Sequence, residues 1–226
     1  MHTYEIEIKS LLGSRENAGN FRKKLKEKDP NLELVGTNNQ LNHYFNVPED
    51  LSKLEENILP LVPSERADSL KKILEEGKSF SIRTRKTGED TVIFVIKASV
   101  GDDTSSNGVA RIEFEGQVPK TLEELDQTLL DSGLSYQAKW SREREEYKSG
   151  NLNITIDRNA GYGYLAEFER VVESASRVDE VKAELLGFMS EIGVEELKQD
   201  RLERMFDFYN KNWRDYYGTE NVFVIE

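Results

Sequence analysis

Apolar and polar residues alternate with a period of two over many short segments of the chain, as they do in strands with one buried and one polar face. The alternation predicts about eight strands, at residues 4–11, 40–47, 80–86, 91–98, 109–117, 139–148, 152–158 and 164–172. Strands with two unlike faces are typical of antiparallel sheets. We therefore expect a mainly β structure of the α+β class.

Helical spacing of apolar residues appears between and after these strands. Helix-start residues stand at Ser14, Ser64 and Thr121. Glu124 follows Thr121 at the spacing of a capping box. We expect a helical insertion at 49–77, broken at its prolines, and C-terminal helices at 177–213. No linker or low-complexity stretch separates these segments, so we expect a single domain over residues 1–226.

Composition narrows the classes of protein that fit. The 226 residues include 31 basic and 43 acidic side chains, a formal net charge of −12, and no cysteine. Without cysteine the chain can form no disulfide framework, thiolate zinc site, iron–sulfur cluster or thiol nucleophile. This usage is typical of a reducing compartment, and we expect a cytoplasmic protein.

The sequence also disfavours some classes of binding partner. The longest apolar run, Val92–Ile96, is far shorter than the roughly 20 residues of a membrane helix. The first ten residues carry neither the basic flank nor the apolar core of a signal peptide. The acidic balance disfavours nucleic-acid polymers, which need a basic face. We expect no membrane and no nucleic-acid polymer as partner, whereas a small anion held by a local basic cluster remains compatible.

The polar faces of the predicted strands carry charges in repeated pairs. Glu-x-Glu occurs at 5/7, 113/115 and 167/169, and Arg-x-Arg at 83/85 and 142/144. A face built only for solubility would mix in Ser, Thr and Asn freely. Two interpretations follow: an open sheet whose charged face meets bulk water, or a closed barrel with a charged, wet interior and helices outside.

The charges on these faces balance. Seven basic side chains stand on them, Lys9, Arg83, Arg85, Lys97, Arg111, Arg142 and Arg144. Seven acidic side chains accompany them, Glu5, Glu7, Glu113, Glu115, Asp157, Glu167 and Glu169. Carboxylate oxygens suit Mg²⁺ or Mn²⁺, and Arg forks suit phosphate oxygens. A ligand that fits both is a phosphate chain with bound divalent cations.

The order of these motifs resembles that of the CYTH family, also called triphosphate tunnel metalloenzymes. The segments are EIEIK (5–9), QLNHYFN (40–46), IRTR (82–85), FVIK (94–97), ARIEFE (110–115), REREEY (142–147), ITID (154–157) and GYGYLAEFE (161–169). The family includes class IV adenylyl cyclases, thiamine triphosphatases and inorganic triphosphatases. The resemblance implies an eight-stranded antiparallel closed β-barrel, the triphosphate tunnel, with surrounding and C-terminal helices.

The resemblance also implies a role for each charged residue. One or two Mg²⁺ or Mn²⁺ ions are expected on Glu5, Glu7, Glu113, Asp157, Glu167 and Glu169. The triphosphate is expected on Lys9, Arg83, Arg85, Lys97, Arg111, Arg142 and Arg144. Further candidates are Glu115, Tyr44 and Arg201. We expect no protein nucleophile: a metal-activated water attacks the terminal phosphorus in line, with either a carboxylate or the metal itself as the activator.

The chain also departs from the family pattern. Members often end in a basic-Ser-Tyr signature on a closing helix, where this chain has Asp200-Arg201-Leu202-Glu203. The insertion at 49–77 and the extension from Trp213 are longer than a minimal domain needs. Three roles fit them: shaping the mouth of the tunnel, forming a homodimer interface, and packing without a function, of which packing is favoured for each.

Three functions are weighed for the chain. The leading hypothesis is metal-dependent hydrolysis of a small substrate: inorganic triphosphate, thiamine triphosphate or a nucleoside triphosphate. A class IV adenylyl cyclase making cyclic AMP is the first alternative. Family cyclases tend to carry His-Phe before the first motif, and here Thr3 follows His2. A module that binds triphosphate or polyphosphate without turnover is the second alternative.

Overall fold

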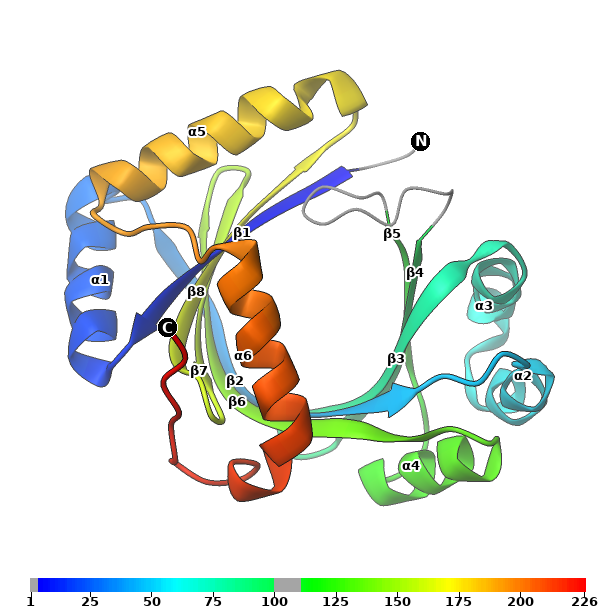
Figure 1. Cartoon of the computed structure of the whole chain (residues 1–226). Coiled ribbons are helices and arrows are strands. Elements are labelled where there is room, and N and C mark those ends of the chain that lie inside the picture. Colours follow the sequence, from blue (N-terminus) through cyan, green and yellow to red (C-terminus); the bar gives the residue numbers. More distant parts are fainter. Residues whose placement is uncertain (1–3, 100–110) are drawn as a thin grey trace. The chain divides into compact units, whose positions relative to one another are not determined.

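The computed structural model describes residues 4–99 and 111–226, and its centre is an eight-stranded antiparallel sheet (Figure 1). The strand order is β1-β8-β7-β6-β2-β3-β4-β5. The strands are β1 (Tyr4–Gly13), β2 (Glu33–Asn46), β3 (Lys78–Thr87), β4 (Thr91–Ser99), β5 (Arg111–Gln117), β6 (Ser135–Ser149), β7 (Leu152–Asn159) and β8 (Gly163–Val172). The prediction of a mainly β, antiparallel α+β structure is confirmed.

Six α-helices accompany the sheet in the described part of the chain. They are α1 (Arg15–Lys28), α2 (Ser52–Ile58), α3 (Ser64–Glu76), α4 (Leu122–Asp131), α5 (Val178–Glu191) and α6 (Gln199–Asn212). Short 3₁₀ turns lie at η1 (Leu59–Leu61), η2 (Ala175–Arg177) and η3 (Trp213–Asp215). Over residues 4–99 and 111–226, no helix combines the length and apolarity needed to cross a membrane.

Most of the predicted helix starts match the structure. The Ser14 hydroxyl accepts the Asn17 amide at 3.1 Å, and Thr121 forms a complete capping box with Glu124. Ser64 is instead the first residue of α3, because Pro63 occupies the N-cap position. Proline at this boundary costs no helical hydrogen bond, because its missing N–H would have no partner within the helix.

Strand β2 is longer than the alternation predicts, since it begins at Glu33 and not near Gln40. Its first five residues are exposed, among them Leu34 and Val35. A stretch with both faces exposed carries no alternation of apolar and polar residues. Pairing within the sheet, which the sequence pattern does not encode, keeps it extended.

The chain divides into two compact units, each with its own apolar core. Among the described residues, unit 1 comprises 4–39 and 142–226, and unit 2 comprises 40–99 and 111–141. In unit 1, α1 and α5 pack on the apolar face of β1 and β8 around Phe21, Phe168 and Leu185 (Figure 1). In unit 2, α3 and α4 pack on β5 and β3, with Ile73, Phe94 and Leu125 in the core. The assignment of all 226 residues to a single domain stays a prediction.

The closed barrel expected from the sequence is not confirmed. The strand order ends at β1 and β5, and the hydrogen bonds of residues 4–99 and 111–226 do not join these two strands. On the end strand β1, the Lys9 carbonyl accepts the Leu197 amide at 2.7 Å. The connection before α6 therefore covers part of this edge, one of the ways in which proteins protect an end strand.

Each unit carries a polar anchor on the face of its sheet that meets the helices. In unit 1, Arg22 of α1 forms a bidentate pair with Glu145 of β6, with both N···O distances 2.7 Å. Tyr147 donates to the same carboxylate at 2.7 Å. Burial, together with this bond to Glu145, raises the pKa of Tyr147 to about 12. The pair fixes α1 against the sheet.

In unit 2 the anchor is the buried carboxylate of Asp126 on α4. His43 Nδ1 lies 2.6 Å from it, Thr84 donates at 2.6 Å, and Tyr136 donates at 2.7 Å. Burial by itself raises the pKa of Asp126, but the hydrogen bonds from these three side chains outweigh it, so the pKa lies below its ordinary value. The carboxylate therefore stays ionised and satisfied inside the unit.

Replacing Asp126 with Asn tests this anchor. Asp126→Asn should lower the free energy of unfolding by about 2–3 kcal/mol at pH 7, because a buried group bonded by three donors loses its charge. Since the folded pKa is lowered, the wild-type advantage is present above about pH 4 and disappears as the pH falls through the folded pKa. Urea denaturation at pH 7 and at steps down to pH 3 measures this. Asp131→Asn, on the exposed end of the same helix, is the control, and equal losses in both variants would contradict the anchor.

Gly163 makes a second test, of the close approach of β1 and β8. Its φ is +73°, and a Cβ there would lie 2.3 Å from the Gly13 carbonyl oxygen. Gly150 has a similar φ of +57° with open space around it. Gly150→Ala should cost about 1 kcal/mol from backbone strain alone, and Gly163→Ala about 3 kcal/mol or more. Equal losses on urea denaturation would show that the approach to Gly13 is not a constraint.

Candidate active site

The strand registers place the predicted charged positions of each unit on one face of the sheet. In unit 1, Lys9 pairs with Glu167, Glu7 with Glu169, and Arg144 with Asp157. In unit 2, Arg83 pairs with Tyr44, and Lys97 with Glu113. Cross-strand partners point to the same side. Helices α1 and α5 in unit 1, and α3 and α4 in unit 2, pack on the opposite, apolar side, around Phe168 and Phe94. The charged face is therefore a property of both units.

In unit 1 the charges form one continuous network, called here the Asp157 cluster: Glu7, Lys9, Arg142, Arg144, Asp157 and Glu167. The Arg144 guanidinium binds both carboxylate oxygens of Asp157, at 2.7 and 2.6 Å, and reaches Glu167 at 2.8 Å. Arg142 donates to Asp157 at 3.1 Å. Lys9 joins Glu7, and its Nζ lies 3.3 Å from Glu167. Asp157, with a side chain 1% exposed, is thus held by two guanidinium groups.

This network keeps Glu167 ionised. Burial alone raises the pKa of Glu167, but the positive charges of Lys9 and Arg144 outweigh it, so the pKa lies well below its usual range. Burial likewise lowers the pKa of Arg144, and its bonds to Asp157 more than reverse that effect. Each charge is stabilised only by its neighbours of opposite sign, so a substitution at one position leaves an uncompensated charge at another.

In unit 2 the charges form a second network, called here the Arg83 cluster: Asn42, Tyr44, Arg83, Arg85, Lys97, Glu113 and Glu115. Lys97 pairs with Glu113 at 2.9 Å, and Arg85 Nη1 pairs with Glu115 at 2.9 Å. Arg85 Nε donates to the Asn42 side chain at 3.1 Å. These contacts fix the direction of the two basic side chains along β3 and β4.

Arg83 differs from its neighbours because most of its hydrogen-bonding capacity is unused. Its side chain is 13% exposed, and Nη1 donates to the Tyr44 hydroxyl at 2.7 Å. Its Nη2 lies 3.9 Å from Glu113 and 3.8 Å from Glu115, beyond hydrogen-bond distance. Nε is buried and has no hydrogen-bond partner among residues 4–99 and 111–226. Burial by itself lowers the pKa of Arg83, but Tyr44 and the charges of Glu113 and Glu115 raise it by more. The pKa therefore lies above its ordinary value, and the guanidinium stays charged.

Four other predicted residues are placed less fully. Glu169 lies opposite Glu7 and also opposite Asn153. For Glu5 and Arg111 the backbone alone is described, and it pairs with Val171 and Ser99. Arg201 lies in α6, where its Nε donates to the Ile225 carbonyl at 2.8 Å. That bond joins Arg201 to the C-terminal segment.

Two polar residues of the charged face were missed by the sequence analysis. Asn42, which is buried, accepts from Arg85, and the Thr155 hydroxyl donates to Glu167 at 3.3 Å. Both occupy period-two positions beside charged residues, Asn42 two residues before Tyr44 and Thr155 two before Asp157. Their period-two spacing was a signal for both residues, but the prediction rested mainly on charged side chains.

The carboxylates of unit 1 suit a divalent cation in their chemistry. Over the described residues, no three acidic or histidine side chains converge into a ready metal-binding group. Instead, the Glu7 and Glu167 carboxylates share Lys9. Glu7 and Glu169 stand directly opposite each other, and like charges in such positions destabilise a sheet unless a cation lies nearby. Hard oxygen donors that already require a cation fit Mg²⁺ or Mn²⁺.

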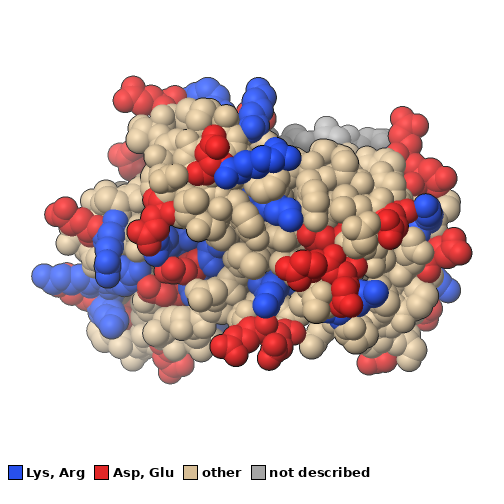
Figure 2. Space-filling view, turned by 90° about the horizontal axis from the view of Figure 1, so that it is seen from below, with Lys and Arg blue, Asp and Glu red and all other residues tan. Residues whose placement is uncertain are grey.

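The molecular surface carries both signs of charge. Figure 2 shows acidic and basic side chains interleaved on the visible face, where no continuous basic stripe runs. The face seen in Figure 2 therefore offers no continuous basic surface for a long polyanion. The basic groups of the two clusters, which lie among carboxylates, suit a small anion better.

Solved structures share this fold, although no curated protein matches the sequence. A conserved hypothetical protein from Pyrococcus furiosus is 18% identical with a TM-score of 0.58, covering 87% of this chain and 93% of its own. A putative adenylate cyclase from Vibrio parahaemolyticus is 12% identical with a TM-score of 0.60, covering 92% and 99%. A putative adenylyl cyclase from Hippeastrum, described as having a dominant triphosphatase activity, is 14% identical with a TM-score of 0.50, covering 89% and 95%.

The sequence itself matches a family model. The model of the CYTH domain matches residues 69–202, which is more than half of the chain and includes strands from both units. This stretch contains Arg83 and Arg85 of one cluster and Arg144, Asp157 and Glu167 of the other. The family expected from the order of the charged motifs is confirmed, and the chain belongs to the CYTH family.

Proposed function

We propose that this protein hydrolyses a small triphosphate in a reaction that requires a divalent metal ion. The observation that carries the proposal is the Arg83 guanidinium, whose Nε is buried and unpaired and whose Nη2 lies beyond hydrogen-bond distance of both glutamates. An unused donor on a buried cation is costly, and a phosphate oxygen is the partner that a guanidinium fork fits best. Structural neighbours named adenylate cyclase or triphosphatase agree with a triphosphate substrate.

The proposal divides the charged residues by chemistry. The basic residues bind phosphate oxygens: Lys9, Arg83, Arg85, Lys97, Arg111, Arg142 and Arg144. The carboxylates of Glu5, Glu7, Glu113, Asp157, Glu167 and Glu169 are the proposed metal ligands. When bound, Mg²⁺ or Mn²⁺ supplies Lewis-acid neutralisation of the phosphate charge. The closed tunnel that the family resemblance implies belongs to the same proposal.

Hydrolysis needs little covalent work from the protein. Water attacks the terminal phosphorus, the bridging P–O bond breaks, and the products are orthophosphate and diphosphate. Arg83 would donate hydrogen bonds to the phosphate oxygens, where negative charge must be stabilised during the transfer. Tyr44 holds Arg83 through the 2.7 Å bond, and Asn42 holds Arg85, so both arginines are oriented before the substrate binds. The leaving group is the diphosphate part of the substrate, and no covalent bond to the protein forms or breaks.

A panel of substrates tests the proposal. The protein is incubated with Mg²⁺ or Mn²⁺ and inorganic triphosphate, thiamine triphosphate, ATP or GTP, and orthophosphate, pyrophosphate and cyclic nucleotide are measured. We expect orthophosphate release from at least one substrate and none when EDTA is added. Cyclic AMP with pyrophosphate would support a class IV adenylyl cyclase instead. Binding of every substrate without turnover would identify a non-catalytic binding module.

Glu7→Gln tests the carboxylates. The change keeps the shape of the side chain and removes its charge, so we expect turnover to fall on the order of 100-fold or more. The melting temperature should stay near that of the wild type, because Lys9 keeps Glu167 as its partner. Glu143→Gln is the matched control, because Glu143 lies on the helix-facing side of β6 and pairs with Arg158. Initial rates at saturating metal measure the effect. Turnover that survives in Glu7→Gln would remove this carboxylate from the metal site.

Arg83→Ala tests the basic residues. Loss of charge-assisted hydrogen bonds should weaken binding of a non-hydrolysable imido analogue of triphosphate by about 10- to 100-fold. Lys86→Ala, on the other face of the same strand, should leave that affinity unchanged. Titration calorimetry measures both. Tyr44→Phe should give a smaller loss, because Arg83 keeps its charge but loses its orienting bond. An Arg83→Ala variant with wild-type affinity would place phosphate binding elsewhere.

A further inference from the structure

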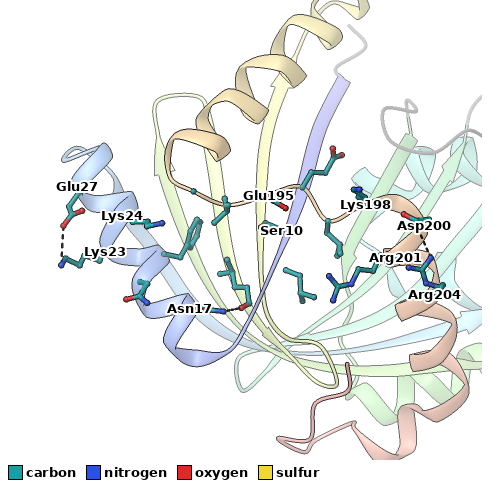
Figure 3. A pocket seen from close by; sticks show the side chains of 18 residues that line it. Ser10, Asn17, Lys23, Lys24, Glu27, Glu195, Lys198, Asp200, Arg201 and Arg204 are labelled. Atoms are coloured by element: carbon teal, nitrogen blue, oxygen red, sulfur yellow. Dashed lines mark hydrogen bonds and ion pairs between the residues drawn. The ribbon is translucent and has the colours of Figure 1, made fainter. Parts of the chain in front are cut away.

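A cavity of about 900 Å³ lies within unit 1, at the end of β1 (Figure 3). Its walls are β1 at Ser10–Leu12, one side of α1, the connection 193–198 and the start of α6. Ser10 and Leu12 alternate with Lys9, so they belong to the opposite side of the strand from the Asp157 cluster. A cavity of this volume is the size of sites that hold small organic molecules.

The cavity has an apolar floor and a charged rim. Leu12, Phe21 and Leu197 are buried residues that line it. The rim carries five basic side chains, Lys23, Lys24, Lys198, Arg201 and Arg204, and four acidic ones, Glu27, Glu195, Glu196 and Asp200. A ligand that fills such a site must combine a compact apolar body with a charged group.

Two of the basic side chains are neutralised within their own helices. Lys23 pairs with Glu27 at 3.8 Å, and Arg204 pairs with Asp200 at 2.9 Å, as the dashed lines in Figure 3 show. Both pairs have the spacing of one helical turn. Their charges therefore contribute little to the recognition of a ligand.

The other three basic side chains keep their positive charge. Arg201 donates to the neutral Ile225 carbonyl, which leaves its charge uncompensated, and in Figure 3 its guanidinium points into the cavity. Lys24 and Lys198 form no ion pair within residues 4–99 and 111–226. Lys24 reaches toward the connection, since a Cβ on Gly193 would lie 2.8 Å from its Nζ.

The remaining acidic side chains compensate this charge only in part. Two acidic side chains, Glu195 and Glu196, stand against the three cations. Glu195 is exposed to solvent, as are Lys24 and Lys198, so water screens charges of both signs at the rim. Lys198 is the N-cap residue of α6 without a side-chain cap, and Arg201 lies in the first turn. Asp200 places one negative charge in the same turn, so the repulsion that a bound anion would relieve is that between the helix dipole and the cations of Lys198 and Arg201.

We propose that this cavity binds a small organic anion, a phosphate monoester with a compact apolar body. The phosphate group would be held by Lys24, Lys198 and Arg201, and the apolar body would lie on Leu12 and Phe21. The site is additional to the proposed triphosphate function, because Lys24 and Lys198 are not among the residues proposed for it. Arg201, which the family resemblance offered as a triphosphate candidate, is here assigned to the cavity instead. Two helices supply the cations, so binding depends on both.

Calorimetric titration with phenyl phosphate, a dianion at pH 8, tests the site. The wild type should bind it, and Lys24→Ala and Lys198→Ala should each weaken binding about 5- to 10-fold, since each removes one charge-assisted contact. Lys26→Ala is the matched control, because Lys26 is an exposed lysine of α1 outside the cavity lining. All three are surface substitutions, and unchanged melting temperatures confirm that the variants fold.

Arg83→Ala separates this site from the triphosphate function. Phenyl phosphate binding that persists in Arg83→Ala and falls in Lys24→Ala and Lys198→Ala supports the cavity, whatever the outcome of the turnover assays. Binding that is lost in Arg83→Ala but unchanged in both lysine variants would place the probe at the Arg83 cluster and overturn the proposal. Absence of millimolar binding by the wild type would also overturn it.

Discussion

Charge compensation on one face of the sheet is the constraint on which the rest of the structure depends. The Arg144 guanidinium binds Asp157 through two parallel bonds and also reaches Glu167, which in turn holds Lys9. Each of these ions has lost water, and the cost of that loss is met only by neighbours of opposite sign. The helices consequently pack on the other face, around apolar side chains such as Phe168 and Phe94.

The same constraint distinguishes residues that are satisfied from residues that are poised to bind. Glu115 accepts from Arg85 at 2.9 Å. Arg83 has one hydrogen-bond partner, the Tyr44 hydroxyl, and two glutamates at 3.8 and 3.9 Å, with its Nε buried and unused over the described part of the chain. An unused buried donor costs free energy, which a ligand oxygen that accepted from it would recover. Phosphate oxygens are acceptors of this kind.

In each unit, a hydrogen-bonded ion fixes a helix to the side of the sheet opposite the charged face. Unit 1 fixes α1 with the Arg22–Glu145 pair, and unit 2 fixes α4 with the carboxylate of Asp126. Both anchors are multiply hydrogen-bonded ions at helix–sheet contacts, where an unpaired group would be costly. They fix α1 and α4 against the strands, and this packing stabilises the strands that carry the charged side chains on their other face.

The period-two alternation of Glu7 and Lys9, or of Arg83 and Arg85, is a local property of each strand. The residues that share the charged face could therefore be predicted from the sequence alone. The local caps at Ser14 and Thr121 were predictable for the same reason. Only the tertiary structure decided the partners. His43 and Asp126 are 83 positions apart, and Tyr44 meets Arg83 through the register of β2 and β3. The extension of β2 to Glu33 and the bond of Leu197 to β1 likewise depend on pairing between distant segments, which no local pattern encodes.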